Sequence, residues 1–181
     1  MLLEKYTSKW VENFKDIKLE LEKALVGIEC LIEHIGSTSV PNLDSKPIID
    51  LDIIYYVPSD FVKIKERLEK FGYYHNGNQG IQDREVFKRK GDESNEILDT
   101  IKHHLYVCPE GSLALERHLL SRNFLRKNDW ARMKYQQMKY EIVEKANQDR
   151  KTYASLKEIY VNDFIDSIIL AEKTNAIPAT K

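Results

Sequence analysis

The chain has 181 residues and carries 28 Lys and Arg against 29 Asp and Glu, a formal net charge of −1. This balance argues against a protein that coats DNA, which would be markedly basic. No run of 18 apolar residues and no apolar N-terminal signal segment occurs, so we expect neither a membrane span nor a signal peptide. Cys30 and Cys108 stand far apart without a CxxC motif, which favours free thiols and a cytoplasmic protein.

Hydrophobic spacing predicts alternating helices and strands in the first part of the chain. Apolar residues recur at helical spacing over 8–26 and over 58–72, and Gly residues end both segments. A turn at 36–41 is predicted to lead into a short helix at 42–46. Strands are predicted at 29–35, 48–57, 85–89, 97–101 and 104–107.

After Pro109 the pattern is helical throughout, with helices predicted at 112–127, 129–147 and 151–173. We therefore expect an α/β (α+β) core with a mixed sheet over 1–109 and a C-terminal helical subdomain over 110–181 packed on it. The net charge is −4 over 1–109 and +3 over 110–181. This division suits a metal site that faces a phosphate-binding surface, although chance variation on solvated helix faces explains it about as well.

The segment that points to chemistry is Gly36-Ser37 followed by the pair Asp50 and Asp52. Because side chains alternate along a strand, the two carboxylates point to the same face, about 7 Å apart, while Ile49 and its apolar neighbours point to the other. Such a pair can share divalent ions. A glycine turn lets backbone N–H groups approach phosphate oxygens closely. Together these parts predict a Mg-nucleotide site.

Asp-x-Asp by itself is often structural, and the ordered combination of turn and acidic strand is more informative. The sequence contains no GxxxxGK[ST], GxGxxG, HExxH or GxSxG motif. P-loop, dinucleotide-binding, zincin and hydrolase sites therefore have no support.

The same segments resemble a known family. The run EHIGSTSVP at 33–41, with KPIIDL at 46–51, is similar to the GrpB-like family, a branch of the nucleotidyltransferase superfamily. The similarity continues in HHLYV at 103–107, RNFLR at 122–126 and DRKTY at 149–153. It covers about residues 5–173. One departure is Tyr106, which stands where the family strand tends to have a second His.

The resemblance implies a nucleotidyltransferase-like core and Mg-dependent transfer of a nucleotidyl group from a nucleoside triphosphate to a small-molecule or protein acceptor. Asp50 and Asp52 would be the catalytic metal ligands. Gly36, Ser37 and Thr38 would hold phosphates. The alternative is an inactive module of the same fold that binds a nucleotide, a metabolite or a protein. The acceptor, the preferred base and the oligomeric state are left open by the sequence.

Several further residues are candidates for substrate contact. Lys46 could neutralise a phosphate or pair with the acids, and His34 is more readily explained as a structural histidine than as a ligand. Arg122 and Arg126 are one helical turn apart and could bind phosphate together. The other candidates for substrate contact are His104, Tyr153 and Lys157.

A third metal ligand has no clear place in the sequence. The candidates are Glu85, Asp99 and His104. Without a third carboxylate, transfer could be slow or absent. We assign His75 and His118 to surface or helix positions with no role in a site.

Overall fold

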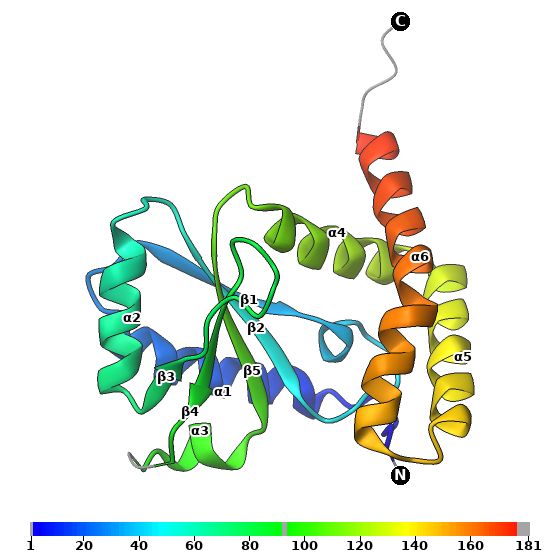
Figure 1. Ribbon diagram of the computed structural model, residues 1–181, viewed down its shortest axis with the longest axis horizontal. Coiled ribbons are helices and arrows are strands. Elements are labelled where there is room, and N and C mark those ends of the chain that lie inside the picture. The colour runs from blue at the N-terminus through cyan, green and yellow to red at the C-terminus, as the bar shows by residue number, and fades with distance from the viewer. Residues whose placement is uncertain (1, 92–93, 177–181) are drawn as a thin grey trace, which may run out of the picture.

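The computed structural model describes residues 2–91 and 94–176 (Figure 1). Their centre is a five-stranded mixed sheet of order β1-β2-β5-β4-β3. The strands are β1 (Cys30–Ile35), β2 (Ile49–Tyr55), β3 (Tyr73–His75), β4 (Glu85–Arg89) and β5 (His103–Pro109). β2 and β5 run parallel, and the other neighbouring pairs are antiparallel. The predicted mixed α/β class is confirmed.

Six α-helices and one 3-10 helix accompany the sheet within the described ranges. They are α1 (Lys9–Ala24), η1 (Ser37–Ser39), α2 (Asp60–Lys70), α3 (Glu96–Thr100), α4 (Leu113–Lys127), α5 (Asp129–Lys145) and α6 (Arg150–Ala176). In the described part of the chain no helix is both long and apolar enough to cross a membrane.

One face of the sheet is apolar and carries the main core. Ile49, Leu51 and Ile53 of β2 are at most 1% exposed and pack with α1, α2 and α3. The alternation predicted for this strand therefore holds, and it turns Asp50 and Asp52 to the opposite face. The strand register places Asp50 beside His104 and Asp52 beside Tyr106.

The C-terminal helices form a second hydrophobic cluster. α5 and α6 lie side by side at one end of the molecule, and α4 runs from them across the sheet (Figure 1). Their apolar side chains pack with residues from the beginning of the chain, namely Leu3, Val40 and Leu43. The turn that contains η1 is thus held between the sheet and the helices.

Two predicted elements are wrong. The segment expected as a strand at 97–101 belongs to α3, because the Asn95 side chain accepts a hydrogen bond from Leu98 N at 3.0 Å and caps a helix. The helical turn expected at 42–46 occurs earlier, as η1. Ser45 instead exchanges backbone hydrogen bonds with Glu4, at 2.8 and 3.0 Å.

Candidate functional site

A cleft lies between the polar face of the sheet and helices α4 and α6. It has two adjoining lobes, of about 520 and about 790 Å³. The smaller lobe is lined by Lys46, Lys139, Arg150 and His104, and we call it the Lys46 lobe. The larger lobe is lined by Arg84, Arg117, Gln79 and Arg122, and we call it the Arg84 lobe. Residues that line both lobes are Gly36, Ser37, Asp50, His118, Ser121, Ala154 and Lys157.

Gly36 is the point of closest approach between the turn and the acidic strand. Its φ of 68° and ψ of −171° fall in a region that is open essentially to glycine alone. A Cβ built on this residue would come within 2.3 Å of Asp50 Oδ2. Ser37 follows at the start of η1 and lines both lobes. The structure therefore brings the predicted phosphate turn and Asp50 together at the centre of the cleft.

Asp50 is the accessible acid of the pair. Its side chain is 26% exposed, and its Oδ1 lies 2.8 Å from Nδ1 of His104. His104 comes from the neighbouring parallel strand and is half-exposed. The prediction that His104 faces the cleft is confirmed.

Asp52 is enclosed by protein. Its side chain is 0% exposed, and Oδ2 lies 2.8 Å from Nδ1 of His118 on α4. Its other oxygen accepts from the Cys108 thiol at 3.8 Å, and burial raises the pKa of that thiol. Both oxygens of Asp52 are thus satisfied by neighbours within the fold, as a buried charge requires.

This arrangement bears on the metal that the family fold implies. In the described residues, no group of three or more His, Cys, Asp or Glu side chains is arranged to hold a metal ion. Of the two acids of the motif, Asp50 alone reaches the cleft, and Mg²⁺ is commonly held by one or two carboxylates together with substrate phosphates and water. The residues fit one Mg²⁺ that arrives with a phosphate ligand. They do not fit a pair of ions shared by Asp50 and Asp52.

The two acidic candidates for a third ligand are engaged elsewhere. Glu85 Oε2 lies 2.5 Å from Nε2 of His75. Asp99 accepts from Arg89 Nε at 2.9 Å and from Asn95 N at 2.8 Å. Neither residue lines either lobe of the cleft. His75, assigned from sequence to a surface position, is in fact half-buried beside Glu85.

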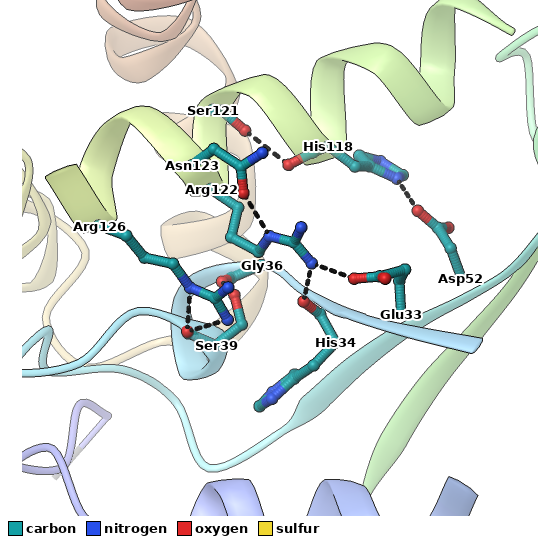
Figure 2. A network of polar contacts seen from close by, with 10 residues as sticks. All are labelled: Glu33, His34, Gly36, Ser39, Asp52, His118, Ser121, Arg122, Asn123 and Arg126. Carbon is teal, nitrogen blue, oxygen red and sulfur yellow. Dashed lines mark hydrogen bonds and ion pairs between the residues drawn. The ribbon is translucent and has the colours of Figure 1, made fainter. Parts of the chain in front are cut away.

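Arg126 connects α4 to the turn, and Arg122 connects α4 to β1 (Figure 2). Arg126 donates through Nε and Nη2 to the carbonyl oxygen of Ser39, at 2.9 and 2.8 Å. Arg122 donates to Glu33 at 2.5 Å and to the carbonyl oxygen of His34 at 2.9 Å. Arg122 still lines the Arg84 lobe, whereas Arg126 lines neither lobe. The structure therefore does not bring the two arginines together in the cleft, as a joint phosphate site would require.

His34 and Thr38 support the turn from behind. The His34 ring stacks on Phe14 with centroids 4.7 Å apart, and its Nε2 lies 3.1 Å from Thr38 Oγ1. The Thr38 hydroxyl donates to the Ile48 carbonyl at 3.3 Å. Burial lowers the pKa of His34 to about 4, so the ring is neutral at pH 7. The structural interpretation of His34 is supported, and Thr38, 1% exposed, is not open to a phosphate.

The Lys46 lobe gathers basic side chains from three segments of the chain. The Lys46 Nζ lies 4.1 Å from the ring centroid of the buried Tyr153 on α6. Burial, and then the positive charges of Lys157 and Arg150, lower the pKa of Lys46 to about 8. Lys139 is 2% exposed and donates to the carbonyl oxygen of Asp44 at 2.6 Å. Within the described residues, Asp50 is the one carboxylate that lines this lobe.

Sequence patterns do not indicate three residues of the cleft. His118, assigned to a surface or helix position, is the partner of Asp52. Lys139 and Arg84 lie in segments that match no motif, and they reach the cleft through the packing of α5 and the course of the loop before β4. The one available signal concerned Lys139, which stands at a position where the helical pattern of α5 otherwise has apolar residues.

Comparison with known proteins fits these observations. The family described as GrpB protein matches residues 1–167. The chain belongs to the GrpB family. The crystal structure of GrpB from Enterococcus faecalis is similar with a TM-score of 0.75 and 27% identity, covering 93% of this chain and 98% of that chain.

Curated GrpB relatives differ in length. Glutamate-rich protein GrpB of Alkalihalophilus pseudofirmus is 28% identical over 170 residues, which cover 93% of this chain and 95% of the relative. The protein YqkA of Bacillus subtilis is 38% identical over 122 residues, but the match spans 33% of YqkA. A weaker likeness, to the Cid1 poly(U) polymerase, has a TM-score of 0.43 and 16% identity. No conclusion follows from a likeness at that level.

Gly36→Ala tests the close approach of the turn to Asp50. Gly77, with φ of 67°, is a matched control, because a Cβ there meets no atom within 4 Å. We expect Gly36→Ala to lower the free energy of unfolding by about 1–3 kcal/mol more than Gly77→Ala, since only the first adds a clash. Urea denaturation measures both. Equal losses would show that Asp50 does not depend on the glycine.

The neutral state of His34 predicts a pH-dependent stability. Its pKa in the folded protein, about 4, lies below the unfolded value of 6.5, so the unfolded state binds more protons between these values. Stability from this residue is present above pH 6.5 and falls by about 3 kcal/mol as the pH drops through 4. Urea denaturation of wild type and His34→Gln between pH 7 and 4 should show curves that converge. Parallel curves would contradict the prediction.

Proposed function

We propose that the cleft binds a nucleoside triphosphate and that the protein transfers its nucleotidyl group to an acceptor. The observation that carries the proposal is the meeting of the Gly36–Ser37 turn, Asp50 and the basic Lys46 lobe in one cavity. Lys46, Arg150 and Lys157 line this lobe against one carboxylate, which favours a polyanion, whereas burial holds the pKa of the fourth amine, Lys139, well below its usual value. The family resemblance, drawn from the motifs at 33–41 and 46–51, supports the same ligand.

The Lys46 lobe is the place we assign to the triphosphate. Lys46, Arg150 and Lys157 would contact its oxygens, and the Gly36–Ser37 turn would approach it through backbone N–H groups. A bound Mg²⁺ would neutralise phosphate charge, held by Asp50 and phosphate oxygens. The α-phosphate would then lie next to Asp50, between the two lobes.

The transfer itself needs positioning more than covalent chemistry from the protein. An acceptor oxygen forms a bond to the α-phosphorus while the bond from that phosphorus to the bridging oxygen breaks. The electron pair of the broken bond leaves with pyrophosphate, and the acceptor proton passes to solvent water. The basic side chains of the Lys46 lobe would stabilise the pyrophosphate as its charge develops.

A second candidate function is nucleotide binding without transfer. The observation that favours it is the enclosure of Asp52, which leaves one accessible carboxylate where the superfamily motif has two. Mg²⁺-dependent binding without release of pyrophosphate would establish this candidate. Pyrophosphate release would exclude it.

Substitution of the two acids should separate their roles. Calorimetric titration measures the affinity for ATP with and without Mg²⁺. We expect wild type to bind ATP more tightly with Mg²⁺, and we expect Asp50→Asn to reduce this gain in affinity at least tenfold. Asp52→Asn should reduce stability but retain the Mg²⁺ dependence, because Asp52 contacts His118 and not the cleft. Asp129→Asn, at a side chain that is 80% exposed, is the control for loss of charge. Failure of wild type to bind any nucleoside triphosphate would refute the proposal.

The lowered pKa of Lys46 predicts that affinity depends on pH. A bound phosphate favours the protonated amine, so affinity for Mg-ATP should fall as the pH rises through about 8, where free Lys46 loses its proton. Between pH 7.5 and 9.5 we expect a loss of about tenfold. Lys46→Arg keeps its charge over this range and should remove most of the dependence. The same slope in both proteins would exclude Lys46 as a phosphate ligand.

A further inference from the structure

Arg84 presents a buried donor with nothing to bond. Its Nε is buried and, among the residues that the structure describes, has no hydrogen-bond partner. The guanidinium lies over the ring of Tyr106, with Cζ 5.0 Å from the ring centroid. Buried polar atoms are nearly always paired, so this orphaned donor marks the Arg84 guanidinium, which lines the Arg84 lobe, as incompletely hydrogen-bonded.

The loop before β4 holds Arg84 in this place. Arg84 N donates to the carbonyl oxygen of Ile81 at 3.3 Å, and Ile81 N donates to that of Asn78 at 3.1 Å. The loop is joined to β4 by a hydrogen bond from Val86 N to the carbonyl oxygen of Gly77 at 2.9 Å. Gln79 and Ile81 of the same loop line the lobe with Arg84. The guanidinium is therefore positioned before any ligand arrives.

The other arginines of this lobe have carboxylate partners. Arg117 forms an ion pair with Asp166, and Arg122 forms one with Glu33. These contacts neutralise both arginines. The remaining carboxylates that line the lobe are Asp50 and Glu158. Arg84 differs from its neighbours in having a carboxylate partner in none of the described ion pairs.

The position of the lobe relative to Asp50 assigns it a role. In phosphoryl and nucleotidyl transfer the attacking and leaving oxygens lie roughly in line on opposite sides of the phosphorus. Asp50 lines both lobes, whereas Lys46 lines one and Arg84 the other. With pyrophosphate leaving in the Lys46 lobe, the acceptor would approach from the Arg84 lobe.

We propose that the Arg84 lobe is the acceptor subsite and that it takes an acceptor with an anionic group, a phosphate or a carboxylate, bound by the Arg84 guanidinium. The inference rests on the proposed function for the place of the nucleotide. Both groups match the planar fork of arginine donors, which the guanidinium presents to the lobe. The ring of Tyr106 packs against the guanidinium. Tyr106 remains a neutral phenol, because burial raises the pKa of its hydroxyl.

The test follows the Nε–H resonance of Arg84 by NMR of the full chain, assigned with Arg84→Lys. The protein is first saturated with Mg²⁺ and a non-hydrolysable ATP analogue, and then titrated with inorganic phosphate and, separately, with acetate. We expect a saturable shift of the Arg84 resonance with at least one anion. The stronger of the two responses identifies the acceptor group as a phosphate or a carboxylate.

Arg84→Gln should weaken binding of that anion at least tenfold and leave affinity for the nucleotide analogue within about twofold. Arg67→Gln, on the exposed face of α2, is the control for loss of charge and should change neither of these two affinities.

If the analogue alone shifts the Arg84 resonance and neither anion adds to the shift, Arg84 binds the nucleotide. The inference is then wrong, while the proposed function stands. If neither anion shifts Arg84 with the analogue bound, the inference is also wrong. Failure of the analogue to bind overturns the proposed function and the acceptor assignment with it.

Discussion

The buried charge of Asp52 constrains how this protein is assembled. A carboxylate at 0% exposure in an apolar strand is costly unless a partner is brought to it, and the partner is His118 of α4. Loss of one member of such a buried pair typically costs about 3–5 kcal/mol, so α4 is strongly held against the polar face of the sheet. The same helix is also bonded to β1 through Arg122 and to the turn through Arg126 (Figure 2). Asp52, which the motif suggests for metal binding, is thereby a contact that holds α4 against the sheet.

The position of α4 has consequences for the cleft. α4 packs with α5 and α6 in the second hydrophobic cluster, and these helices carry Lys139, Arg150 and Lys157 to the sheet. Asp50 is left as the accessible acid of the pair, at the junction of the two lobes. The division of charge along the sequence is only partly reflected in the cavity, because Lys46 and Arg84 come from the part before Pro109, and Glu158 and Asp166 come from the part after it.

Much of the fold could be predicted because its signals are local. The alternation in β2 placed its apolar and acidic faces correctly, and the helical periodicities located α1, α2 and the three C-terminal helices. The errors arose where individual hydrogen bonds outweigh propensity. Asn95 caps α3 in a segment whose apolar residues suggested a strand, and Glu4, distant in the sequence, pairs with Ser45. A hydrogen bond of that kind leaves no periodic trace in sequence.

By itself, the sequence determined that Gly36, Ser37 and Asp50 form a unit, because a glycine turn and a strand with alternating acids need only local geometry. It also favoured His104 over His103 as the histidine that faces a site, since neighbouring side chains alternate along a strand. Only the tertiary structure decided that Asp52 is enclosed, that Arg122 and Arg126 bond to β1 and to the turn, and that Lys139 and Arg84 line the cavity. Those outcomes depend on which helix packs over which strand and how deeply each side chain is desolvated, and both are properties of the assembled core.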